Sequence, residues 1–184
     1  MGRAYKNFWS LNIDEAVVSG ILRDETSKDV EVLMPMNAQM KGVDLVLMNI
    51  KNKKVISVQV KGSKAFEPKK SETEKFGAGS VGWFFLDKKI INNATADYFI
   101  FLVYVIEQSL ENGRRHIEPH TITIPVEKIK ELSEQYKKPH PDRFSYYFWV
   151  NPHTKEAFDF RDNRYDVSEY LDNVGFKNLN NALL

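Results

Sequence analysis

The apolar residues of this chain follow a helical repeat near the N-terminus and strand-like runs along most of the remaining sequence. Ile13, Val17 and Ile21 recur at every fourth position, and Val18 and Leu22 widen the same stripe. This spacing predicts a helix over residues 12–23, which Asn12 can cap. From runs rich in β-branched and aromatic residues we expect strands over residues 30–34, 43–50, 55–60, 81–86, 98–106, 116–124, 144–150 and 156–160.

Two further helices and one polar loop complete the predicted elements. Pro125 can begin a helix that extends to Tyr136, and residues 167–173 are typical of a short helix. Residues 62–80 are rich in Lys, Glu, Ser and Gly, which indicates a loop with one helical turn near residues 71–76. We expect a single α/β domain over residues 1–184, with a mixed sheet flanked by helices. Its parts are core motifs in about 10–64, later strands and a helix in about 81–136, and a C-terminal hairpin and short helix in about 144–174.

The β-rich runs on either side of residues 51–54 predict an antiparallel hairpin with polar groups on one face. With a two-residue loop, Asp44 lies opposite Lys61. In the same register Gln59 lies opposite Val46. Because opposed residues share a face of the sheet, Asp44, Gln59 and Lys61 project from one side. The other side is wholly apolar and must pack on a core.

These three polar groups suit a divalent-metal site that cleaves phosphodiesters. Asp44 offers an anionic oxygen ligand, Gln59 its side-chain oxygen and Val60 its backbone carbonyl. Lys61 can orient or deprotonate a metal-bound water and offset charge that develops on a phosphate. Glu15 is the candidate for a second carboxylate, because it lies in line with the apolar stripe of the first helix. It can equally close a capping box with the N-cap residue three positions earlier.

The ordered set of these residues resembles the PD-(D/E)XK nuclease superfamily, in its branch with a Q-x-K ending. The likeness is carried by Glu15 in its helix, then GVDLVL around Asp44 and VQVKGS around Gln59 and Lys61, over about residues 10–64. It implies a restriction-endonuclease-like three-layer fold and a DNA endonuclease of restriction or repair type that depends on Mg²⁺ or Mn²⁺. In that pattern Glu15, Asp44 and Gln59 are metal ligands. Lys61 is the catalytic lysine.

Two departures from the superfamily pattern keep a second function open. Valine rather than proline precedes Asp44, and glutamine occupies the second acidic position, at Gln59. Loss of one negative charge lowers the expected affinity for the metal. The alternative is a catalytically inactive nucleic-acid-binding or interaction module on the same fold.

Positive charge is concentrated around the predicted site, although the net charge of the chain is only +1. Residues 51–75 hold eight basic and three acidic side chains. The near-zero net charge excludes a uniformly basic coat, and the local excess predicts a one-sided surface that faces DNA. The candidates for contacts to phosphate, each of which can also be an ordinary surface residue, are Ser63, Lys64, Lys69, Lys70 and Lys75.

Composition narrows the chemistry and the location. The chain contains no cysteine, which excludes disulfides, thiolate zinc sites and cysteine nucleophiles, so a metal site must use oxygen or imidazole ligands. The longest apolar run, residues 98–106, is far shorter than the ~20 residues that span a bilayer, and the N-terminus lacks a signal-peptide pattern. We therefore expect a soluble, cytoplasmic protein, and the resemblance together with the local positive charge implies DNA as its partner. Double-strand cleavage would imply a homodimer with one site per protomer.

Three other patterns were weighed against this function. Residues 77–82 match GxGxxG, but a polar loop precedes them and an aromatic strand follows, whereas dinucleotide binding needs a strand before and a helix after. A small-molecule enzyme that uses this loop is the third hypothesis. His116 and His120 are four residues apart, but Pro119 disfavours the helix that would join them, so we interpret both as ordinary strand residues. The aromatic run at 144–149 predicts core packing.

Overall fold

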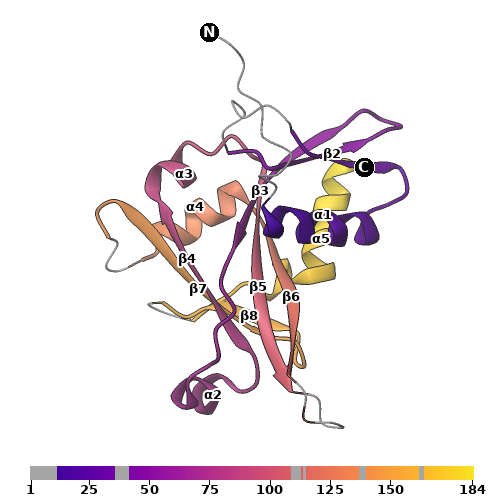
Figure 1. The fold of residues 1–184 in the computed structure, drawn as a ribbon. Helices are drawn as coiled ribbons and strands as arrows, with labels where there is room; N and C mark the ends of the chain where they lie inside the picture. Colours follow the sequence, from indigo (N-terminus) through magenta and orange to yellow (C-terminus); the bar gives the residue numbers. More distant parts are fainter. Residues whose placement is uncertain (1–11, 36–41, 109–112, 114, 137–139, 162–163) are drawn as a thin grey trace.

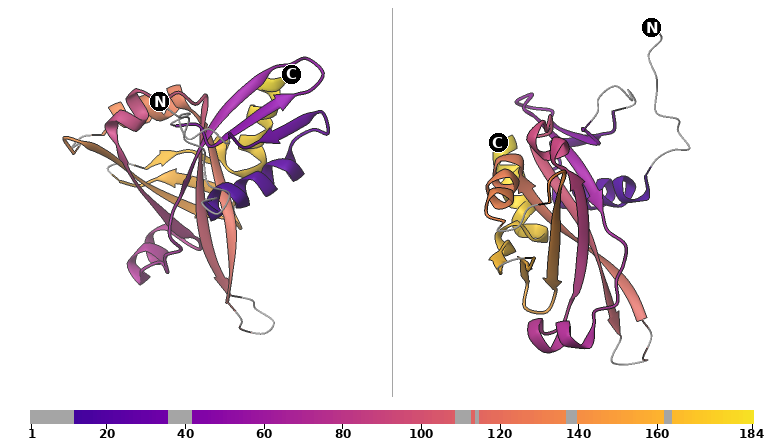
Figure 2. Two further views of the ribbon diagram at one scale, coloured as in Figure 1. Left: turned by 45° about the horizontal axis from the view of Figure 1, so that its top comes forward. Right: turned by 90° about the vertical axis from the view of Figure 1, so that its left-hand side faces the viewer.

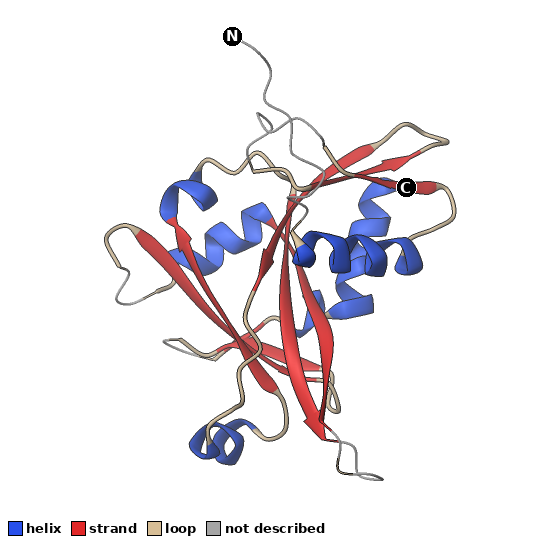
Figure 3. Ribbon diagram, viewed as in Figure 1, coloured by secondary structure: helices blue, strands red, loops and turns tan. Residues whose placement is uncertain are grey.

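A computed structural model describes residues 12–35, 42–108, 113, 115–136, 140–161 and 164–184, which form two β-sheets and the helices around them (Figures 1 and 3). The larger sheet is mixed, with strand order β1-β2-β3-β5-β6, and the smaller is antiparallel, with order β4-β7-β8-β9. The strands of the larger sheet are β1 Val30–Leu33, β2 Leu45–Asn49, β3 Val55–Gly62, β5 Tyr98–Gln108 and β6 Arg115–Pro125. Those of the smaller sheet are β4 Ser80–Asp87, β7 Arg143–Asn151, β8 Glu156–Asp159 and β9 Tyr165–Asp166.

The helices of the described residues lie between and beside these strands. They are α1 Ile13–Glu25, α2 Lys70–Phe76, α3 Lys88–Asn92, α4 Val126–Glu134 and α5 Asp172–Leu183, with a 3₁₀ helix at Ser168–Tyr170. Among them, no helix combines the length and the apolar character needed to cross a membrane. The prediction of an α/β protein with a mixed sheet is confirmed.

Strand β3 occupies the centre of the larger sheet. It pairs antiparallel with β2 and parallel with β5, and β5 forms a long antiparallel hairpin with β6. A parallel pair cannot be joined by a tight turn. The connection from β3 to β5 therefore passes through α2, β4 and α3, and its strand β4 becomes part of the second sheet.

The alternating side chains of β5 contribute to two cores at once. Phe101 lies between the sheets, with ring centroids 4.9 Å from Phe84 and 5.0 Å from Phe148. Ile100 and Leu102 point the other way and pack with α1 and α5. The larger sheet is thus covered by α1 and α5 on one face, and by the second sheet together with α4 on the other (Figure 2). Burial on both faces explains why residues 98–106 are apolar without interruption.

Helix α1 is present where it was predicted, and apart from Ile13 its predicted stripe packs on the core, with Val17 and Ile21 partly buried. Asn12 caps it, since its side chain accepts a hydrogen bond from the backbone N–H of Asp14 at 3.1 Å. Val18 and Leu22 are fully buried, whereas Ile13 is 76% exposed. The stripe that anchors α1 is therefore the one in line with Glu15.

The C-terminal helix is longer than the short helix expected at 167–173. A 3₁₀ helix at Ser168–Tyr170 is followed by α5, which begins at Asp172 and continues to Leu183. Contacts with β6 define this start, because Asp172 accepts a hydrogen bond from the backbone N–H of Thr121 at 2.8 Å. The local sequence contains no sign of such a tertiary contact, so it does not predict where α5 begins. Two smaller differences are that Pro125 is the N-cap of α4 rather than its first residue, and that α3 was not expected.

Candidate functional site

The β2–β3 hairpin has a register two residues away from the predicted one. Leu45 pairs with Val58, so the predicted pairing of Asp44 with Lys61 is wrong. A shift of two positions keeps every side chain on its predicted face, whereas a shift of one would have inverted both strands. The apolar face is buried as expected, with exposures of 6% or less for Val43, Leu45, Leu47, Ile56, Val58 and Val60.

The turn of the hairpin explains this register. The last described strand pair is Met48 with Val55, so the connection is longer than two residues. The backbone N–H of Lys53 donates to the carbonyl of Asn49 at 2.9 Å, and Asn49 Oδ1 accepts from the N–H of Asn52 at 3.3 Å. Lys53 has a φ of 64°. Asparagine side chains that bond their own turn favour this wider loop over a two-residue turn.

Asp44 lies alongside Gln59 and is bonded to the residues on either side of it. Its backbone N–H donates to the carbonyl of Val58 at 2.8 Å, and its Oδ2 accepts from the N–H of Val60 at 2.8 Å. Within a strand, the N–H and C=O of one residue point to the same side. The carbonyl of Val60 is therefore directed to the side on which Asp44 lies, as a shared metal site requires.

Gln59 is nearly enclosed, with 7% of its surface exposed. It lines a hollow of about 220 Å³ together with Gly42, Thr95 and residues of α3. A carboxylate buried at position 59 would lose much more hydration free energy than an amide does. The burial of this position therefore suits the uncharged side chain of Gln59.

Lys61 completes the polar face and is influenced by two carboxylates. Burial lowers the pKa of Lys61, and the charges of Asp44 and Glu15 partly oppose that shift. Its ammonium makes no hydrogen bond or ion pair with the described part of the chain. The lysine therefore loses a proton more readily than an exposed one, and it lies near the two carboxylates that sequence analysis selected.

The first turn of α1 is bonded to β5, and packs against the end of β3, through Asp14, the residue next to Glu15. The hydroxyl of Tyr104 donates to Asp14 Oδ1 at 2.8 Å, and burial and this carboxylate raise the pKa of Tyr104 to about 12. A Cβ at position 62 would overlap the Asp14 carboxylate. Gly62 therefore lets the first turn of α1, which carries Glu15, lie directly against the end of β3. Sequence analysis missed Asp14 and Tyr104, although the glycine directly after the lysine is a local sign of close approach.

The lysines predicted to contact DNA do not form one patch. Lys69, Lys70 and Lys75 belong to α2 or its N-cap, and α2 lies at the opposite end of the molecule from β2 (Figure 2). All three are exposed, as is Lys64 between α2 and β3. The structure thus separates the α2 lysines from Asp44, Gln59 and Lys61.

Ser63 is buried rather than presented to solvent. Its Oγ accepts a hydrogen bond from the N–H of Trp83 at 2.9 Å and donates to the carbonyl of Lys64 at 3.1 Å. The bond from Trp83 joins the end of β3 to β4. We therefore leave Ser63 out of the DNA contacts proposed for this protein.

The glycine-rich segment does not have the geometry of a dinucleotide site. Residues 77–82 follow α2 and lead into β4, without a helix after them. The aromatic run after residue 143 is core, as predicted, with Tyr146, Phe148 and Trp149 fully buried.

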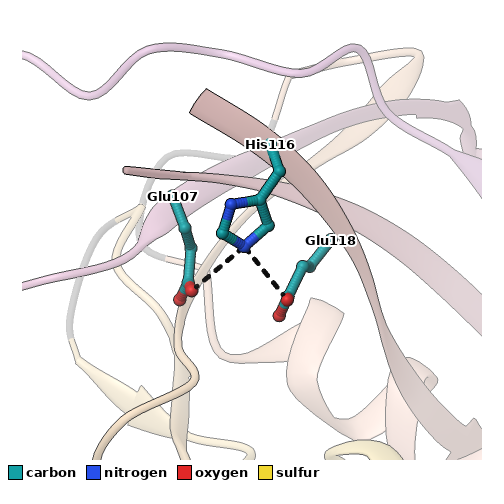
Figure 4. A group of neighbouring side chains, drawn as sticks. All are labelled: Glu107, His116 and Glu118. Carbon is teal, nitrogen blue, oxygen red and sulfur yellow. Dashed lines mark hydrogen bonds and ion pairs between the residues drawn. The ribbon is translucent and has the colours of Figure 1, made fainter. Parts of the chain in front are cut away.

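A second group of metal-ligating side chains was missed by sequence analysis. Glu107 of β5 and His116 and Glu118 of β6 place one ligand atom each within 4.8 Å of the others (Figure 4). The spacing of four between His116 and His120 suggests a shared site only on a helix. In a strand, the alternation His116, Glu118, His120 puts all three on one face, and this signal was available in the sequence.

No protein-family model, curated protein or solved structure matches this chain. Function must therefore be argued from the geometry of its sites.

Proposed function

We propose that this protein is a Mg²⁺-dependent DNA endonuclease with a restriction-endonuclease-like fold. Its site comprises the residue before β2, the end of β3 and the first turn of α1. The observation that carries the proposal is that Asp44, Gln59 and Lys61 share one face of the hairpin, with Asp44 Oδ2 2.8 Å from the backbone nitrogen of Val60 between the other two. Asp44 and Glu15 come from separate elements, yet both raise the pKa of a Lys61 whose burial lowers it. A lysine beside two carboxylates at the end of a strand suits metal-dependent phosphodiester hydrolysis.

The ligands proposed for the metal are oxygens. Asp44 has about four acceptor positions on its carboxylate, so it can bind Mg²⁺ while keeping the bond to the N–H of Val60. The carbonyl of Val60 and a carboxylate oxygen of Glu15 supply further ligands, and Gln59 supplies its amide oxygen. A Mg²⁺ ion held there would supply activated water for attack on the phosphodiester.

Lys61 is proposed to position that water and to stabilise the charge that develops on the phosphate. Its lowered pKa increases the neutral fraction relative to an exposed lysine. A neutral amine can accept the proton of a metal-bound water, and the ammonium that results lies close to the phosphate.

The fold supports the proposal. The larger, mixed sheet has helices on both faces. As in the superfamily that the sequence resembles, α1 precedes the hairpin that carries the polar residues. The second sheet, which is inserted in the β3–β5 crossover and extended near the C-terminus, is an addition to this core.

The test is cleavage of supercoiled plasmid DNA with Mg²⁺ or Mn²⁺. Asp44→Asn preserves the shape of the side chain, and Lys61→Met preserves most of its apolar volume. Each is expected to reduce the cleavage rate by about 10²-fold or more. Lys54→Met, at an exposed lysine of the same hairpin, is the matched control and should cleave like the wild type.

Two outcomes would contradict the proposal in different ways. Undiminished cleavage by Asp44→Asn or Lys61→Met would show that these residues are not the site. Salt-sensitive DNA binding without cleavage under either metal would favour the inactive nucleic-acid-binding module, which the neutral Gln59 also suits.

A further inference from the structure

Three of the four histidines of the chain gather at one end of the β5–β6 hairpin. His116 and His120 belong to β6, and His153 lies in the turn between β7 and β8. The fourth, His140, lies in the segment before β7, at the other end of that strand. Carboxylates link the three. Glu118 Oε2 is 3.9 Å from His120 Nε2, and Glu107 Oε1 is 3.6 Å from His153 Nε2.

The centre of this cluster has the spacing of a metal site. His116 Nε2 is 3.1 Å from Glu118 Oε1 and 3.7 Å from Glu107 Oε2 (Figure 4). Ligand atoms bound to a tetrahedral zinc ion at about 2.0–2.1 Å lie about 3.3 Å from one another. The two measured distances lie on either side of that value, so a small adjustment of side chains would let all three bind one ion.

A separate observation points to a missing ligand. His120 Nε2 is buried and has no hydrogen-bond partner within the described residues. The opposite nitrogen, Nδ1, lies 2.8 Å from Asp172 Oδ2, and this contact holds the ring with Nε2 toward Glu118. Histidines that bind metals are commonly oriented in this way, by a carboxylate on the other ring nitrogen.

We propose that Glu107, His116 and Glu118 bind one divalent transition metal ion of the zinc class, with His120 next to Glu118 as the nearest candidate for a fourth ligand. Imidazole nitrogens favour Zn²⁺ and its neighbours over Mg²⁺, which prefers a shell of oxygens. The two glutamates balance the charge of the ion. This site shares no ligand with the one at Asp44, and the inference does not depend on the proposed nuclease activity.

The ion would link two paired strands near the end of their hairpin. Glu107 lies near the end of β5, and His116, Glu118 and the neighbouring His120 share one face of β6, with Asp172 at the start of α5 bonded to His120. Three protein ligands leave one tetrahedral position, which His120 or a water can fill. The expected role of the ion is to hold β5 and β6 together at the end of the long hairpin.

The test uses the full chain, freed of metal by a chelator and titrated with Zn²⁺ against a chromophoric competitor. The wild type is expected to bind one Zn²⁺ that excess Mg²⁺ does not displace. His116→Ala and Glu118→Gln, at side chains that are 46% and 47% exposed, should fold normally and weaken binding by about tenfold or more. His140→Ala is the matched control and should bind like the wild type.

A second readout is the melting temperature with and without Zn²⁺. It should rise with Zn²⁺ for the wild type, His140→Ala and Asp44→Asn, and it should rise less for His116→Ala. Absence of Zn²⁺ binding by the wild type would overturn the proposal. So would full binding by the His116→Ala and Glu118→Gln double variant, or loss of binding in Asp44→Asn alone, which would locate the ion at the other site.

Discussion

Replacement of Gly62 by alanine tests how α1 is positioned against the sheet. The backbone at Gly62 does not have positive φ, so alanine is conformationally allowed and the effect of the substitution is steric. Its Cβ would overlap the carboxylate of Asp14. The carboxylate must then rotate away, and it loses the hydrogen bond from Tyr104.

The magnitude follows from that bond. A hydrogen bond to a charged group contributes about 1.5–3 kcal/mol. We expect Gly62→Ala to lower the free energy of unfolding by about 2 kcal/mol, with some relief if the first turn of α1 moves outward. Such a movement displaces Glu15 from Lys61, so cleavage should also fall although every proposed catalytic residue is present.

The assay is urea denaturation followed by circular dichroism, and the chain provides a control with the opposite expected sign. Gly20 lies in α1, and a Cβ added there would have no atom within 4 Å, so Gly20→Ala should stabilise the protein by about 0.5–1 kcal/mol. In an Asp14→Ala background the clash disappears, and Gly62→Ala should become nearly neutral. Equal stability changes at the two glycines, or an undiminished cost in the Asp14→Ala background, would refute the steric explanation.

Two further predictions concern the core between the sheets. Asp159 is fully buried, and burial raises its pKa even though Tyr136, Tyr147 and Arg161 donate hydrogen bonds that oppose the shift. An acid with a raised folded-state pKa contributes stability below its unfolded pKa and loses it as pH rises through the folded value. In the wild type, the free energy of unfolding should therefore fall as pH rises above about 4. Urea titrations of Asp159→Asn should show a smaller fall, and an unchanged pH profile would contradict this prediction. Phe101→Ala should cost about 3–5 kcal/mol in the same assay, because its ring is fully buried between Phe84 and Phe148, and a cost below ~1 kcal/mol would contradict that packing.

The hairpin shows what alternation predicts well and what it does not. The faces of β2 and β3 follow from the order of polar and apolar residues, so Asp44, Gln59 and Lys61 were assigned to the correct side. The register depends on the turn, and the turn depends on distant residues. Asn49 and Asn52 donate their side-chain amides to the carbonyl of Leu183 at 3.2 and 2.8 Å. No local pattern contains a contact between residues so far apart in the chain.

The cluster at the end of the β5–β6 hairpin was missed for another reason. Sequence spacing was read with a helical period, in which His116 and His120 needed a helix that Pro119 disfavours. With the period of a strand, the same residues and Glu118 share a face, and the antiparallel register adds Glu107 opposite His116. The shared face of His116, Glu118 and His120 could be predicted from the sequence. The position of Glu107 opposite His116 required the register of a hairpin whose connecting residues lie partly outside the described chain.

The path of β3 and its crossover changes what the lysine-rich stretch implies for DNA. Consecutive lysines begin at the hairpin turn, continue through Lys61 and end on α2, at the other end of the molecule. The positive charge that is compact in sequence is therefore spread along the molecule rather than gathered around the proposed metal site. Under the proposed function, separate lysines would meet separate phosphates, each adding to the salt dependence of binding. The exposed α2 lysines should then affect affinity and its salt dependence, while Asp44 and Lys61 should affect cleavage, so that binding and chemistry can be separated by substitution.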